Sequence, residues 1–272
     1  MESPYISSYE QWIRSQESDL RDLTTAAAEA TSDVELQGRV DRSLRLYEEY
    51  AARRRALAAA DGPTFFCPPW CSAFENAVLW MGGCRPTLAI RLLYSLSGLD
   101  LEARLDDFLR GLVHAPRGGL MALSARQINL VNELHCRTLR EEDRLSARLA
   151  TLHEDVADAP LLPLVIKDVR TSASAPGSPS AGGGGNAAAA AAADGGRGWS
   201  GEEAAAAAME SYAGRLAGLV EEGDRLRVAT VRALTTEILR PQQAVELLVA
   251  AKQLHLTVHD WGRRRDLHRV SV

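Results

Sequence analysis

Apolar residues return at every third or fourth position along most of this chain, and this spacing limits the fold more than any other feature. Two N-terminal series follow it, with one glutamine among them: Tyr9, Trp12, Gln16, Leu20 and Leu23, then Leu36, Val40, Leu44, Tyr47 and Tyr50. Side chains spaced in this way share one face of an α-helix. A helix with one apolar face must bury it against another helix or a sheet. The sequence therefore predicts an all-α, multi-helix bundle.

Further helices are predicted along the rest of the chain. We expect them over about residues 73–81, 86–96, 99–112 and 124–158, then from Met209 to Ile238 and from Pro241 onward. Two of these starts carry a capping box, in which a serine is followed three residues later by Glu75 or Gln127. The segment 161–169 is the only strand candidate.

The stretch VLWMGGCRPT interrupts this helical pattern at residues 78–87. Either Gly82 or Gly83 suits the left-handed conformation that stops a helix. Pro86 suits the first position of the next helix, because its missing N–H has no helical partner there. The stretch therefore predicts a tight corner between two helices, formed by Trp80, Gly82, Gly83, Arg85 and Pro86.

Residues 171–200 differ in kind from the rest of the chain. Gly, Ala, Ser and Pro dominate this segment, and it has no apolar stripe that could enter a core. Such composition is typical of a flexible, disordered linker. We therefore divide the chain into an N-terminal helical part (1–170), a linker (171–200) and C-terminal helices (201–272) that complete the same domain.

Composition narrows the classes of function. The formal net charge of −5 gives no overall electrostatic attraction to nucleic acid. No window holds about 18 consecutive strongly apolar residues, so we expect no membrane span. The N-terminus does not have the pattern of a secretory signal. The four cysteines do not form a disulfide framework, which favours a reduced compartment, the cytosol or the nucleus.

No catalytic motif stands out, so we expect the protein not to be an enzyme. Cys67, Cys71 and Cys84, with His114 or His135, are candidate zinc ligands. Their spacing matches no common zinc pattern, and free cysteines are usually buried in cores. We therefore favour packing and predict no metal site.

The most specific chemical feature is LHLTVHDW, where His255 and His259 lie four residues apart. On a helix both project from the same face, at the edge of an apolar stripe. They are candidates for metal or haem ligands, with two boundary histidines as the alternative. The tracts Arg53–Arg55 and Arg263–Arg265 suit nuclear import, calmodulin or phosphate contacts, but favourable charge at a helix C-terminus explains them more simply.

Several blocks, taken in order, resemble the plant Delay-of-Germination family, whose domain is also the C-terminal domain of TGA-type bZIP transcription factors. These blocks are SYEQWIRSQESDLRDL, VDRSLRLYEEY, LWMGGCRPT, LSARQINLVNEL, EEDRLSARLATL and LRVATVRALTTEILRPQQAVELLVAAKQLH. They cover nearly all of the chain outside residues 171–200. The chain has no bZIP region, so it resembles the stand-alone members.

The resemblance implies a non-enzymatic regulator of seed dormancy and abscisic-acid signalling, in the nucleus and also the cytoplasm. It implies protein partners, with type 2C protein phosphatases or bZIP factors as candidates and Tyr9 and Trp12 in the partner-binding segment. It also implies haem binding at His255 and His259. A transcription regulator that reaches DNA directly or through bZIP partners is the alternative, and a small apolar ligand between the helices is a third hypothesis.

Overall fold

The computed structural model describes residues 3–29, 32–109, 123–158, 162 and 201–270. Its elements, in chain order, are α1 (Pro4–Ala28), α2 (Asp33–Ala58), η1 (Pro63–Phe65), α3 (Ala73–Val78), α4 (Thr87–Leu109), α5 (Ala125–Val156), α7 (Gly201–Arg232), the π-helical turn η4 (Ala233–Ile238) and α8 (Pro241–Val270). Within the described ranges the sole β feature is an isolated bridge between Trp80 and Gly83. The all-α prediction is confirmed.

Three predicted boundaries were wrong. The helix expected from Met209 begins at Gly201, the first residue of α7. Residues 86–96 and 99–112 were expected to form separate helices, but α4 runs unbroken from Thr87 to Leu109. A glycine inside a helix costs only about 1 kcal/mol relative to alanine, so Gly98 does not end it. The helix predicted to reach Met81 stops at Val78. The linker 171–200 and, apart from residue 162, the strand candidate 161–169 lie outside the described residues.

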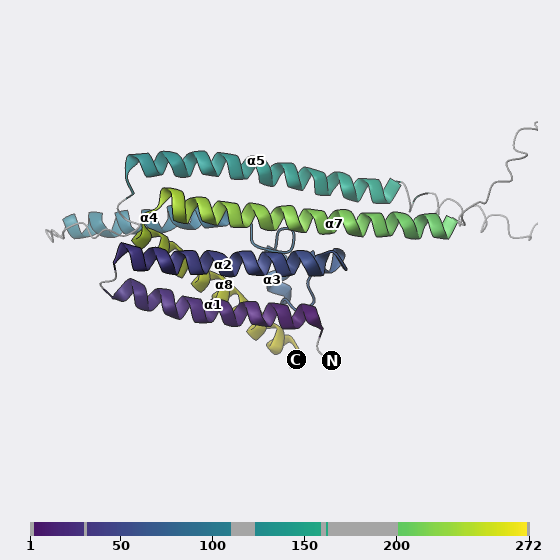
Figure 1. Ribbon diagram of the computed structural model, residues 1–272, viewed down its shortest axis with the longest axis horizontal. Helices are drawn as coiled ribbons and strands as arrows, with labels where there is room; N and C mark the ends of the chain where they lie inside the picture. Colours follow the sequence, from purple (N-terminus) through teal and green to yellow (C-terminus); the bar gives the residue numbers. More distant parts are fainter. Residues whose placement is uncertain (1–2, 30–31, 110–122, 159–161, 163–200, 271–272) are drawn as a thin grey trace, which may run out of the picture.

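The long helices form a layered bundle (Figure 1). Helices α5, α7, α2 and α1 follow one another across the molecule, and α8 crosses behind α1 and α2. Helix α7 packs on α2 and α5, while α8 packs on α1, α2 and α3. The helices on the two sides of residues 163–200 therefore share their packing surfaces.

The main apolar core lies where α1, α2, α4, α5 and α8 meet. Its fully buried members include Leu23, Val40, Ile90, Val131 and Leu248. A second core joins α5 and α7 to the corner through Met81, Leu145, Leu152, Leu216 and Leu219. Leu23, Val40 and Leu145 lie at positions that the helical spacing predicts as inward-facing, so local periodicity and tertiary burial agree. Among the described helices, none combines the length and the apolar character that crossing a bilayer requires.

Candidate functional site

The predicted corner is a tight turn closed by two backbone hydrogen bonds. The N–H of Trp80 donates to the carbonyl of Gly83 at 2.7 Å, and the N–H of Gly83 donates back to Trp80 at 3.1 Å. The two residues between them have positive φ, 48° at Met81 and 67° at Gly82, as type I′ turns require. Gly82, and not Gly83, is thus the left-handed glycine. A Cβ on Gly82 would lie 2.2 Å from the carbonyl oxygen of Phe65, so the turn also needs glycine for a close backbone approach.

Two arginines, the buried Arg54 and the partly buried Arg227, hold the corner through hydrogen bonds to its carbonyl groups. Arg54 of α2 donates to the carbonyl of Gly82 at 2.6 Å. Arg227 of α7 donates to the carbonyl of Cys84 at 2.6 Å and also to those of Trp80 and Met81. Carbonyl groups that have no helical partner are thereby satisfied inside the protein.

The carboxylate of Asp224 joins these two arginines. Its oxygens lie 2.9 Å from Nε of Arg54 and 2.6 Å from Nη1 of Arg227. Arg54 is only 6% exposed, so it is not a surface phosphate contact of the Arg53–Arg55 tract. Burial lowers the pKa of Arg227. Sequence reasoning missed this role of Arg54, Asp224 and Arg227, because nothing in the local pattern shows which helix faces the corner.

The other predicted corner residues have structural contacts of their own. Trp80 donates from Nε1 to the hydroxyl of Ser146 at 3.1 Å, and Arg85 lies 6.0 Å from the centre of its ring. Pro86 directly precedes α4. Fully buried Glu142 accepts from the backbone N–H of Thr87 at 2.7 Å and caps that helix from α5. The corner therefore sets the angle between α3 and α4.

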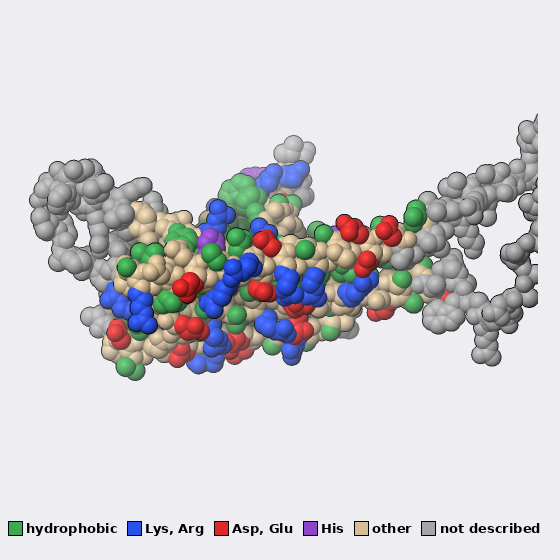
Figure 2. All heavy atoms as spheres, turned by 90° about the horizontal axis from the view of Figure 1, so that it is seen from above, with side chains coloured by type: hydrophobic (Ala, Val, Ile, Leu, Met, Phe, Trp, Pro, Cys, Tyr) green, Lys and Arg blue, Asp and Glu red, His purple; other side chains and the backbone are tan. Residues whose placement is uncertain are grey.

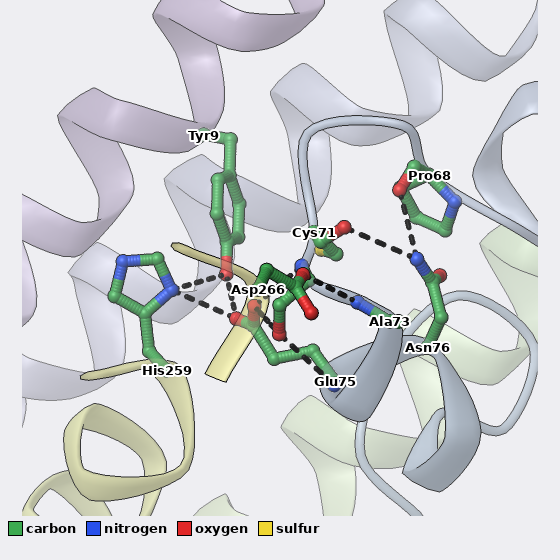
Figure 3. A network of polar contacts seen from close by, with 9 residues as sticks. Tyr9, Pro68, Cys71, Ala73, Glu75, Asn76, His259 and Asp266 are labelled. Atoms are coloured by element: carbon green, nitrogen blue, oxygen red, sulfur yellow. Dashed lines mark hydrogen bonds and ion pairs between the residues drawn. The ribbon is translucent and has the colours of Figure 1, made fainter. Parts of the chain in front are cut away.

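A cluster of three polar side chains, Tyr9, Glu75 and His259, joins α1, α3 and α8 (Figure 3). The hydroxyl of Tyr9 donates to Oε1 of Glu75 at 2.7 Å. Nδ1 of His259 lies 2.8 Å from the same oxygen and 3.4 Å from the Tyr9 hydroxyl. Ser72 donates its backbone N–H and its hydroxyl to the other oxygen of Glu75, at 2.7 and 2.6 Å. One carboxylate thus completes a capping box and also connects three helices.

Burial and hydrogen bonding set the ionisation of this cluster. Burial alone raises the pKa of Glu75, but hydrogen bonds from His259, Ser72 and Tyr9 outweigh it and lower the pKa to about 2. Burial raises the pKa of Tyr9, and the nearby Cys71 and Glu75 raise it further. At neutral pH the cluster therefore holds an ionised carboxylate and a neutral phenol.

His255 lies one turn before His259 but in a different setting. It is half-buried, and its ring centre is 6.3 Å from that of Trp12. Burial lowers the pKa of His255 to about 4, so the ring is neutral at pH 7. Among the described residues no hydrogen-bond partner of His255 is found, whereas Nδ1 of His259 is already engaged. Of the two, His255 is the histidine that would be better able to hold a haem iron, because its ring is neutral and its nitrogens have no hydrogen-bond partner among the described residues.

Tyr9 and Trp12 lie in the packing seam between α1, α2 and α8. Their exposed fractions are 8% and 6%. Trp12 stacks on Tyr50 with ring centres 4.2 Å apart and meets the edge of Tyr47 at 5.3 Å. In this conformation neither side chain is open to a partner. Partner binding through them stays a prediction, and it requires α1 to move.

A buried lysine was missed by sequence reasoning. Lys252 of α8 is fully buried, and its Nζ lies 2.8 Å from Oε1 of Gln16 and 3.0 Å from Oδ2 of Asp19 in α1. Ser43 of α2 donates to the same Asp19 oxygen at 2.5 Å. The available signal was a lone lysine within the apolar run VELLVAAKQL.

The cysteines gather no metal site within the described ranges, where no group of three or more candidate ligands occurs. The expectation that they are buried was wrong for Cys67, Cys84 and Cys136, which are exposed. Cys71 is partly buried, and burial raises its pKa to about 12. His135 packs beside Tyr94 at 5.8 Å. His114 lies outside the described residues.

These features define the class of the protein: an all-α bundle in which buried polar clusters join helices distant in sequence. Comparisons with known proteins identify the family. A family model described as "Seed dormancy control" matches residues 19–95. The chain is 32% identical over 269 residues to Protein DOG1-like 3 of Arabidopsis thaliana, covering 97% of this chain and 85% of that protein. The chain belongs to the Delay-of-Germination family.

Two further relatives describe the breadth of this family. Protein RESPONSE TO ABA AND SALT 1 of Arabidopsis thaliana is 27% identical over 82% of this chain and 75% of its own length. Transcription factor TGA2.3 of Oryza sativa subsp. japonica is 27% identical over 43% of this chain and 34% of its own length. The domain is thus shared with TGA factors, as the sequence blocks predict.

Proposed function

We propose that this protein is a non-enzymatic regulator of the seed-dormancy and abscisic-acid signalling type, which acts through protein partners. The observation that carries the proposal is the 32% identity to a DOG1-like protein over 97% of the chain. The polar clusters support it. Glu75, His259 and Tyr9 are engaged with one another, and Asp224 with Arg54 and Arg227, so each group serves helix packing.

Type 2C protein phosphatases are the partners we propose first, and bZIP factors second. The test is binding of the full chain to purified phosphatase, measured by interferometry, alongside a pull-down from seed extract with mass spectrometry. Binding by the wild-type chain supports the proposal. If neither assay recovers a phosphatase or a bZIP factor, the proposed partners are wrong.

The variants Trp12→Phe and Trp12→Ala probe the partner role of α1. Trp12→Phe keeps an aromatic ring against Tyr50 and is expected to keep most of the stability, whereas Trp12→Ala opens a cavity. Loss of phosphatase binding by Trp12→Phe, with an unchanged melting temperature, supports a contact between Trp12 and the partner. If only Trp12→Ala loses binding, and it also loses stability, then Trp12 acts in the packing between α1, α2 and α8 and does not contact the partner.

Transcription regulation is the second candidate, because the relatives include a TGA factor. A transcription regulator acts in the nucleus, so we propose the nucleus as the main location and the cytoplasm as a second one. Imaging of a fluorescent fusion tests this location. A mobility-shift assay over a salt series separates direct from indirect DNA contact. Sequence-selective binding by the purified chain would overturn the adaptor role.

Haem remains a candidate ligand, and we propose that His255 would hold its iron. The neutral ring and lack of a hydrogen-bond partner among the described residues support this assignment. Bound haem would supply redox or gas-sensing chemistry. Titration with hemin should give a saturable Soret shift that His255→Ala weakens more than His259→Ala, with His135→Ala as the matched control. Equal titrations for all four proteins would refute the site.

A further inference from the structure

The C-terminal part of α8 carries a stripe of side chains that the described helices leave largely exposed. Trp261 is 46% exposed and Leu254, two turns earlier, is 39% exposed. Arg264, Arg265 and His268 are exposed as well. Their spacing places all five on one face of the helix. We call these five residues the α8 stripe.

The α8 stripe is held in a defined orientation by contacts on the opposite face of α8. Gly262 lies so close to α3 that a Cβ would stand 2.1 Å from the hydroxyl oxygen of Ser72. Asp266 accepts from the backbone N–H of Ala73 at 3.0 Å (Figure 3). The helix cannot rotate without breaking these contacts, so the stripe is presented to solvent in advance of any binding.

Trp261 itself is preordered. Its ring meets Phe74 edge-on, with ring centres 4.3 Å apart, and the guanidinium of Arg265 lies 5.7 Å from its centre. Tryptophan and arginine are enriched in the hot spots of protein interfaces, and Trp261 is a half-exposed tryptophan held in place by an aromatic ring and an arginine. In Figure 1 the C-terminal end of α8 emerges beyond α1, beside the N-terminus, and Figure 2 shows a projection from the bundle in which hydrophobic and Lys/Arg side chains lie together.

The charge around this stripe is opposite to that of the chain. Arg263, Arg264, Arg265 and Arg269 are exposed, and within the described part of the chain none of them forms an ion pair with a carboxylate. By contrast, Arg148 on α5 is exposed but is neutralised by Glu222 at 2.6 Å. A local cationic surface on a chain of net charge −5 favours an acidic partner.

We propose that the α8 stripe binds an acidic amphipathic helix of a partner protein. Leu254 and Trp261 are seven residues apart, about 10.5 Å along the helix axis, which matches two apolar side chains seven residues apart on the partner. The arginines beside them pair with its Asp and Glu residues. The main apolar groups that duplex DNA offers in its major groove are thymine methyls, which are a small surface for Leu254 and Trp261. Two half-exposed side chains are also too little apolar surface for stable insertion into a membrane. This proposal adds a binding surface and a class of partner to the proposed partner-binding function, and it rests on that function.

The test is selection from a phage-displayed library of 18-residue helical peptides on the immobilised full chain. We expect enriched peptides with Asp or Glu beside apolar residues at seven-residue spacing. Arg264→Glu/Arg265→Glu should weaken their binding about tenfold or more, and Trp261→Ala should do the same. Arg137→Glu/Arg140→Glu on α5 is the matched control, since both arginines are exposed there, and it should bind like the wild type.

Each other result overturns the proposal. These results are no enrichment, enrichment without acidic residues, and binding that survives charge reversal at Arg264 and Arg265. A 20-base-pair duplex or a vesicle of anionic lipid that binds through these residues in place of the peptides would assign the surface to that ligand. The melting temperature of each variant shows that it folds. If the wild-type chain still binds phosphatase or bZIP factors while the peptide selection fails, only the α8 stripe is refuted, and the proposed function stands.

Discussion

At the scale of single residues, Gly82 shows how one position controls the corner. Its φ is 67°, and an added Cβ would lie 2.2 Å from the carbonyl oxygen of Phe65. Gly82→Ala should therefore lower the free energy of unfolding by about 2 kcal/mol or more, measured by urea denaturation. Gly98→Ala is the matched control. A Cβ at Gly98, inside helix α4, would meet no atom beyond its chain neighbours and the helix backbone within 4 Å, so this substitution should raise the free energy of unfolding by about 0.5–1 kcal/mol. Equal effects of the two substitutions would contradict this account.

Glu75 gives a second prediction at this scale. Its pKa is lowered from 4.5 to about 2 in the folded protein. A carboxyl group with a lowered folded pKa stabilises the fold fully above its unfolded pKa, and loses this effect as pH falls toward the folded pKa. The shift corresponds to a contribution on the order of 3 kcal/mol at neutral pH.

The measurement is the free energy of unfolding of the wild type and Glu75→Gln between pH 7 and pH 3. The wild type should be more stable at pH 7, and the difference should shrink progressively below about pH 4.5, because Glu75 in the unfolded chain begins to bind a proton there. Other carboxyl groups titrate in both proteins and cancel in the difference. A difference that does not change with pH would show that Glu75 is not stabilised in its ionised form.

At the scale of helices, the docking of α8 on α1 depends on the buried ion pair between Lys252 and Asp19. Removing one partner leaves an uncompensated buried charge, so Lys252→Met and Asp19→Asn should each cost about 3–5 kcal/mol. The double variant should cost less than the sum, with a coupling energy of about 1–3 kcal/mol in a double-mutant cycle. Lys252 also contacts Gln16 and Tyr47, and the double variant loses these contacts as well. They account for the stability that it still loses. Additive effects would mean that the pair is not coupled.

At the scale of the whole molecule, α7 and α8 pack against α1, α2 and α5 even though residues 163–200 separate them in the chain. A protease recognition sequence inserted within 171–200 should therefore allow cleavage without separation of the two parts. Size-exclusion chromatography should give one peak before and after cleavage, and two peaks once urea is added. Two peaks in native buffer would show that the helical sets fold apart.

Replacing residues 171–200 with a shorter Gly-Ser segment should leave the melting temperature nearly unchanged.

Local sequence determined the helices and where most of them begin. The three-and-four spacing, the capping boxes of Ser72 and Ser124, and Pro241 are local signals, since a helix is built from contacts within four residues. The ordered blocks, above all LWMGGCRPT, also determined the family, which the comparisons show. The helix break predicted near Gly98 is absent, because a single glycine destabilises a helix by less than the packing of α4 stabilises it.

Only the tertiary structure decided which side chains meet. Arg54, Asp224 and Arg227 come from α2 and α7, and their network at the corner depends on how those helices cross. The same holds for Lys252 with Asp19, and for the burial of Trp12 in a seam where the pattern allowed a partner surface. Helical periodicity predicts the inward face of each helix but not which helix it faces, because contacts between distant segments arise from the packing of the whole chain.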